Sequence, residues 1–138
     1  MRLATALLFL LASSALTQAQ SEPNLIPKPV ELRMEQGSLD LGCPWQVEVS
    51  ESVSRELFDL LQAELAPLQL PKQKDCLLPL RIQFNRIQPD TMLPDEWHMV
   101  QVRPDGISVT ATTEEGLFRG SRSLIQLLEQ GRETVTLP

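Results

Sequence analysis

The sequence is poor in the side chains from which metal and catalytic centres are commonly built. It contains one histidine, His98, and two cysteines, Cys43 and Cys76. These three residues are too few for a closed zinc site within one chain, and no motif for another cofactor takes its place. Basic residues are also scarce, with 12 lysines and arginines against 18 aspartates and glutamates and a net charge of −6. Nucleic acids and anionic membranes require a basic face, so both are disfavoured as partners.

The chain also lacks an apolar run long enough to span a membrane comfortably. Residues 1–19 hold one charge, Arg2, then the apolar residues 7–12 and the small or polar end Thr17-Gln18-Ala19. This order is typical of a secretory signal peptide, because an anchor would be longer and a charged stop-transfer cluster would follow it. We therefore predict cleavage after Ala19 and no transmembrane anchor afterwards. Export predicts a secreted or periplasmic protein, or a lysosome-like compartment if the source is a eukaryote.

The part that follows the signal peptide is long enough for one domain with one core. Residues 20–29 contain three prolines and predict an extended lead-in. Residues 30–138 predict one α+β domain, with one sheet of several mainly antiparallel strands covered by two helices. Apolar and polar residues alternate, as in strands, at 30–34, 39–41, 45–49, 80–84, 97–103, 107–111 and 133–137. We interpret the first two of these segments as one hairpin. The turn residues Pro104-Asp105-Gly106 predict another between the fifth and sixth.

Helical spacing of apolar residues replaces this alternation after the third predicted strand. Ser50 is a suitable N-cap with Glu51 in the first turn, so the first helix is predicted to begin there. Apolar residues recur at helical spacing from Val53 until Pro67 ends the run. The apolar stripe of this helix is expected to cover the sheet.

The second helix is predicted to begin at Thr112, with Glu115 three residues later completing a capping box, and to end near Gly131. Gly116 and Gly120 lie four residues apart and leave a strip of this helix without side chains. Glycine inside a helix is less stable than alanine by about 1 kcal/mol, so the strip predicts close approach to another backbone. That backbone belongs either to the domain's own sheet or to a second domain, which would make the strip an interdomain contact.

Export would place Cys43 and Cys76 in an oxidising compartment, where disulfides form and persist. Their separation along the chain does not show whether their Cα atoms come within bridging distance. A disulfide and two separate thiols are therefore both open.

Four motifs, in their order along the chain, resemble one known family. They are LIPKP at 25–29, GISVTA at 106–111, EGLFRG at 115–120 and LIQLL at 124–128. Together they resemble the N-terminal domain of the family 20 glycoside hydrolases. The resemblance implies a non-catalytic α+β domain whose partner is a following (β/α)8 barrel. That barrel removes terminal β-linked N-acetylglucosamine or N-acetylgalactosamine from glycans. It is not part of this sequence, so we expect the chain to be a fragment, or to have lost the barrel, and to be inactive alone.

None of the polar residues of this chain is assigned to catalysis. Family 20 enzymes use adjacent aspartate and glutamate residues on a glycine-flanked barrel strand, whereas Asp95-Glu96 precedes an ordinary hairpin strand. We interpret this pair as a solvated loop end. His98 is predicted to be a partly buried strand residue or a contact residue, and Ser121 and Ser123 lack the strand-turn-helix context of a nucleophile elbow.

The favoured function is therefore structural support of a hexosaminidase barrel. The alternative is a free-standing secreted module that binds a glycan or a protein, and a cleft centred on Trp45 or Trp97 would favour it. Otherwise both tryptophans are expected to be packing residues. A small metal-free hydrolase is not favoured, because no acid, base and nucleophile are predicted to converge.

Overall fold

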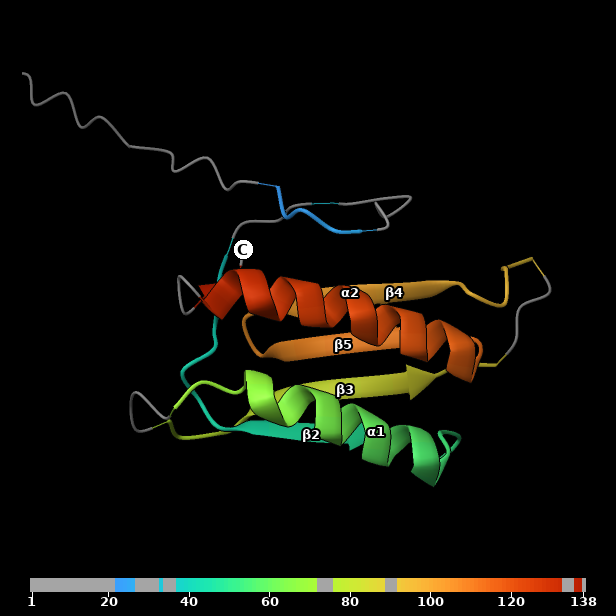
Figure 1. Cartoon of the computed structure of the whole chain (residues 1–138), viewed down its shortest axis with the longest axis horizontal. Coiled ribbons are helices and arrows are strands. Elements are labelled where there is room, and N and C mark those ends of the chain that lie inside the picture. Colours follow the sequence, from blue (N-terminus) through green and yellow to red (C-terminus); the bar gives the residue numbers. More distant parts are fainter. Residues whose placement is uncertain are drawn as a thin grey trace, which may run out of the picture.

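The computed structural model describes residues 22–26, 33, 37–71, 76–88, 92–132 and 136–137. The predicted signal peptide and half of the predicted lead-in lie outside these residues. Two helices lie side by side on one face of a four-stranded sheet (Figure 1). The prediction of an α+β domain with two covering helices is therefore confirmed. The elements in chain order are β1 (Leu39–Asp40), β2 (Trp45–Val49), α1 (Arg55–Leu65), the 3₁₀ helix η1 (Ala66–Leu68), β3 (Leu80–Arg86), β4 (His98–Arg103), β5 (Gly106–Ala111), α2 (Glu114–Arg132) and β6 (Thr136–Leu137).

The four-stranded sheet is mixed, which corrects the expectation of a mainly antiparallel one. Its strand order is β2-β3-β5-β4, in which β2 and β5 both run parallel to β3 and only β4 and β5 are antiparallel. The reason is that α1 carries the chain from β2 to a parallel neighbour, and the chain after β3 passes to the far side of β5. The predicted hairpin of β4 and β5 is confirmed, with Val100 opposite Val109.

A second, two-stranded sheet joins distant parts of the chain. Leu39 lies opposite Leu137 and Asp40 opposite Thr136 in antiparallel pairing of β1 with β6. The strand-like tail predicted over residues 133–137 thus contains a short strand. The first strand of the hairpin predicted at 30–41 falls mostly outside the described residues, so that hairpin stays a prediction.

The start of α1 differs from the predicted one. Ser54, not Ser50, is the N-cap, and its hydroxyl accepts a hydrogen bond of 3.3 Å from the Leu57 amide. Ser50 instead continues the pairing of the strands, because its amide donates to the Phe84 carbonyl at 2.9 Å. Residues 50–53 then form a turn that the Val53 amide closes on the Ser50 carbonyl. The prediction failed because either serine satisfies the local rule, and the contact with β3 decides between them.

The start of α2 is also displaced from the predicted one, by one residue. The Thr113 carbonyl accepts the first helical hydrogen bond, from the Leu117 amide at 3.1 Å, and its hydroxyl accepts another from the Gly116 amide at 3.0 Å. Thr112 is buried in front of the helix. The residue three positions after Thr113 is a glycine, so the predicted reciprocal capping box does not form. The helix continues through Gly131.

The core lies between the helices and the sheet. Alternate residues of β3 and β5 point toward the helices and are buried, as the period of a strand requires. Each helix contributes one apolar stripe to the same layer. The fully or almost fully buried side chains of this layer include Leu61, Leu65, Ile82, Phe84, Ile107, Val109, Leu117, Leu124 and Leu128.

The glycine strip of α2 lies against the domain's own sheet. A Cβ atom on Gly116 would be 2.5 Å from the Trp97 carbonyl oxygen and 2.9 Å from the Ala111 Cβ. A Cβ atom on Gly120 would be 2.5 Å from Cγ1 of Val109. Of the two neighbours that the sequence left open, the structure therefore places the sheet, and not a second domain, against this strip.

Cys43 and Cys76 are joined by a disulfide, with their Cα atoms 5.7 Å apart. Cys43 lies just before β2 and Cys76 shortly before β3. The bond therefore ties together the beginnings of two neighbouring parallel strands. Both cysteines are consumed by it, so neither thiol is free for chemistry.

Candidate functional site

The adjacent carboxylates that the sequence singled out serve the structure of a turn. The Asp95 carbonyl accepts a hydrogen bond from the Thr113 hydroxyl at the start of α2. The Glu96 carboxylate forms an ion pair of 3.1 Å with Arg119, and 61% of its side chain is exposed. The backbone of one residue and the side chain of the other thus hold the turn against α2.

His98 begins β4 beneath α2, where it contacts a serine without forming a catalytic arrangement. Its Nδ1 lies 3.0 Å from the Glu96 carbonyl oxygen and its Nε2 lies 3.4 Å from the Ser123 hydroxyl. A backbone carbonyl, rather than a carboxylate, orients the ring, so the pair lacks the third group of a triad. Ser121 is buried and donates to the Phe118 carbonyl at 2.6 Å. The two serines therefore act as helix and packing residues.

Nothing in the described part of the chain forms a metal centre. Within it, no three histidine, cysteine, aspartate or glutamate residues cluster closely enough to hold an ion. The helices found there are also too short or too polar to cross a membrane.

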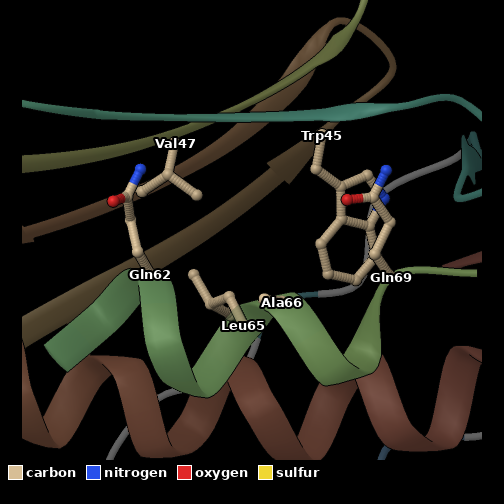
Figure 2. A pocket seen from close by; sticks show the side chains of 6 residues that line it. All are labelled: Trp45, Val47, Gln62, Leu65, Ala66 and Gln69. Carbon is tan, nitrogen blue, oxygen red and sulfur yellow. The ribbon is translucent and has the colours of Figure 1, made fainter. Parts of the chain in front are cut away.

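One hollow opens between β2 and the helical layer. It is an open depression with a volume of about 300 Å³, lined by two residues of β2, three of α1 and η1, and one residue directly after η1. Figure 2 shows the β2 side chains pointing toward the helix and two glutamine side chains reaching up from it. We call this site the β2–α1 hollow, and its lining residues are Trp45, Val47, Gln62, Leu65, Ala66 and Gln69.

The β2–α1 hollow combines an apolar base with uncharged polar groups. Leu65 is buried at its base, and the indole N–H of Trp45 is directed away to the Leu41 carbonyl at 3.4 Å. Gln62 and Gln69 are exposed; Gln62 lies in α1 and Gln69 directly after η1. Each side-chain amide can both donate and accept hydrogen bonds. The lining holds no charged residue, so the site suits a neutral ligand.

Sequence reasoning identified only one residue of this hollow, Trp45. The sequence carried no signal for the others as a site, because Gln62 lies in the predicted helix whereas Gln69 follows the Pro67 that ends it. Nothing in the sequence showed that this helix overhangs β2. Trp97 does not line the hollow, and its amide closes the turn before β4 by donating to the Pro94 carbonyl at 2.9 Å.

A second surface that the sequence did not reveal lies on the C-terminal half of α2. Gln126 pairs with the backbone of Ile26, accepting from its amide at 2.8 Å and donating to its carbonyl at 2.7 Å. Gln130 pairs with Asn24 in the same way, at 3.0 and 2.9 Å. Leu25, between these two residues, is buried in the core. The two glutamines thus hold an extended segment of the chain as a neighbouring strand would.

The N-terminal ends of the two helices are joined by one carboxylate. Glu114 accepts hydrogen bonds from the amide of Ser54 at 2.7 Å and from its hydroxyl at 3.1 Å. The same carboxylate lies 3.8 Å from the Arg86 guanidinium at the end of β3. Further along the helices, Arg122 forms an ion pair with Glu64. These contacts fix α1 against α2.

The chain is similar to one described family and to a part of a solved enzyme. The family described as glycosyl hydrolase family 20, domain 2, matches residues 22–138. The crystal structure of a β-N-acetylhexosaminidase from Bacteroides fragilis NCTC 9343 superposes with a TM-score of 0.55 at 23% sequence identity. The match covers 75% of this chain and 20% of that one, so this chain resembles about a fifth of that enzyme. At this identity the likeness to that structure shows the fold. No curated protein matches the sequence.

Proposed function

Since this chain belongs to glycosyl hydrolase family 20, we propose that it is a non-catalytic domain supporting the barrel of a β-N-acetylhexosaminidase. The observation that carries the proposal is the family match to domain 2 over residues 22–138. In this role the domain packs against a catalytic (β/α)8 barrel and stabilises its fold or the rim of its site. The hydrolysis itself belongs to the barrel.

The state of the polar residues supports a non-catalytic role. A glycosidase acting by acid catalysis needs carboxylates aimed at one sugar. In the described part of the chain, Glu96 is paired with Arg119, Glu114 caps the neighbouring helix, and Glu64 is paired with Arg122. Each of these carboxylates is used in holding elements together.

The first test is an activity assay of the purified chain. We expect no release of 4-nitrophenol from its N-acetyl-β-glucosaminide, and a rate above that of the buffer would refute the non-catalytic assignment. The second test joins the chain ahead of the barrel of the Bacteroides fragilis enzyme in place of the matching segment. The chimera should keep hexosaminidase activity to a higher temperature than the barrel alone, and equal heat stability would refute the supporting role.

We propose, further, that the protein is exported, with residues 1–19 as a signal peptide and the lead-in at 20–29 as its mature start. The short apolar run and the small residues before Ala19 support this proposal. The destination is the periplasm or the exterior, or a lysosome-like compartment in a eukaryote. Mass spectrometry of the native protein should find Gln20 as the first residue, and an intact residue 1 would contradict it.

A free-standing binding module is the second candidate function. The observation that favours it is the β2–α1 hollow, which has Trp45 in its lining. The two candidates differ in their dependence on the barrel. A binding module would retain its ligand as an isolated chain, whereas a supporting domain would show its effect only on the barrel.

A further inference from the structure

The outer edge of β2 offers a row of backbone hydrogen-bonding groups. β2 is at one end of the sheet order, and no other strand in the described part of the chain pairs with its outer side. The Leu80 amide donates to the Pro44 carbonyl at 2.8 Å, and the Ser50 amide donates to the Phe84 carbonyl. In a parallel ladder, residues that bond to the same neighbour alternate along the strand. The even-numbered residues 44–50 therefore face β3, and the backbones of residues 45, 47 and 49 face outward.

The same alternation brings the hollow to this edge. Trp45 and Val47 direct their side chains into the β2–α1 hollow, and their N–H and C=O groups lie on the open side of the strand. An occupant at the edge therefore meets two features together. One is a line of backbone donors and acceptors, and the other is a neutral hollow with an apolar base.

We propose that the outer edge of β2 binds an extended, uncharged peptide segment as an additional strand, with one peptide side chain in the β2–α1 hollow. The spacing of the backbone N–H and C=O groups along the edge of β2 identifies the occupant as another extended chain. Residues two apart in a strand are separated by about 6.6–6.8 Å, which matches the repeat of another extended chain. The lining holds no charged residue, so the side chain that enters the hollow is uncharged and meets Leu65 and the amides of Gln62 and Gln69.

The position of α1 favours a single segment over a second copy of the domain. Figure 1 shows α1 lying across β2 at this edge of the sheet, and the hollow is lined from both elements. Pairing of β2 with β2 of another copy would place two α1 helices over adjacent edge strands. Strands are about 4.8 Å apart, whereas packed helices need about 8–10 Å between their axes. A bare extended segment meets no such obstacle.

The experiment measures hydrogen exchange by NMR on the full chain with a chosen probe peptide. The probe is an acetylated and amidated five-residue peptide of alternating threonine and valine. At ten times its dissociation constant, exchange at the amides of Trp45, Val47 and Val49 should slow about tenfold. The amides of Gln46 and Glu48 face β3 and should change far less. A peptide with proline at its centre lacks one donor and should protect them less.

A pair of matched variants tests the role of the hollow. Ala66 lines it and Ala63 lies outside it, and both alanines are exposed. Ala66→Phe should fill the hollow and abolish the slowed exchange, whereas Ala63→Phe should leave it intact. Three results would overturn the proposal. They are no slowing with the probe at millimolar concentration, equal slowing at all five amides of β2, and a shift of the Trp45 indole with N-acetylglucosamine that leaves the edge amides unprotected.

Discussion

The close approach of α2 to the sheet makes Gly120→Ala a demanding test of the packing. Alanine is the better helix former by about 1 kcal/mol, so the helix alone predicts a more stable protein. The added Cβ, however, would lie 2.5 Å from Cγ1 of Val109, a side chain with no exposed surface. Overpacking of a core typically destabilises by about 1–3 kcal/mol. We expect the clash to exceed the gain and the free energy of unfolding to fall by about 1–2 kcal/mol.

The assay is urea unfolding followed by circular dichroism, applied to a double-mutant cycle. Val109→Ala removes the atom that would clash and by itself should lower the free energy of unfolding by about 2 kcal/mol. In the Gly120→Ala background the same change should have a smaller effect, with a coupling of at least about 0.5 kcal/mol. Gly116→Ala is the comparison variant. The nearest obstacle to its added Cβ is the Trp97 carbonyl oxygen, a main-chain atom that Val109→Ala does not remove. A stabilising Gly120→Ala, or a cycle without coupling, would refute the reasoning.

Three further predictions concern the contacts that hold the domain together. Reduction of the Cys43–Cys76 disulfide opens a loop with a sequence separation of 33. The free energy of unfolding in urea should then fall by about 3–4 kcal/mol, and an unchanged midpoint in reductant would argue against this bond. Glu114→Ala removes the acceptor of the Ser54 amide and hydroxyl at the start of α1. The free energy of unfolding, measured by thermal unfolding, should fall by about 1–2 kcal/mol. An unchanged stability would show that this carboxylate does not hold the two helices together. Gln126→Ala removes both the acceptor of the Ile26 amide and the donor to the Ile26 carbonyl, so the Ile26 amide should exchange faster while the stability of the sheet is little altered.

The candidate site could be predicted only in part. Trp45 was identified as a residue suited to a cleft, but nothing in the sequence pointed to Gln62 or Gln69. The hollow forms because α1 lies over the edge of β2, and the periodicity of apolar residues within each segment does not show this arrangement. The pairing of α2 with the extended N-terminal segment is a clearer case, because Gln130 pairs with Asn24 across a separation of 106 residues. Sequence patterns read along one segment do not reveal a partner at that distance.

The order of the strands was decided by the tertiary structure for a related reason. Alternation of apolar residues shows which face of a strand is buried, but it does not name the neighbouring strand. The hairpin of β4 and β5 could be predicted because Pro104-Asp105-Gly106 imposes a turn on residues that are already adjacent. The parallel pairing of β3 with β5 could not be predicted, because it depends on β4 joining the sheet on the far side of β5.

The sequence by itself determined the classes of the elements, the two helical stripes, the hairpin turn and the family to which the chain belongs. These depend on backbone preferences and side-chain spacing within a few residues. The tertiary structure alone decided that Ser54 and Thr113 begin the helices, that the glycine strip faces the sheet, and that β2 is left at an open edge. In each of these cases local preference allowed more than one arrangement, and a contact with a distant part of the chain selected one of them.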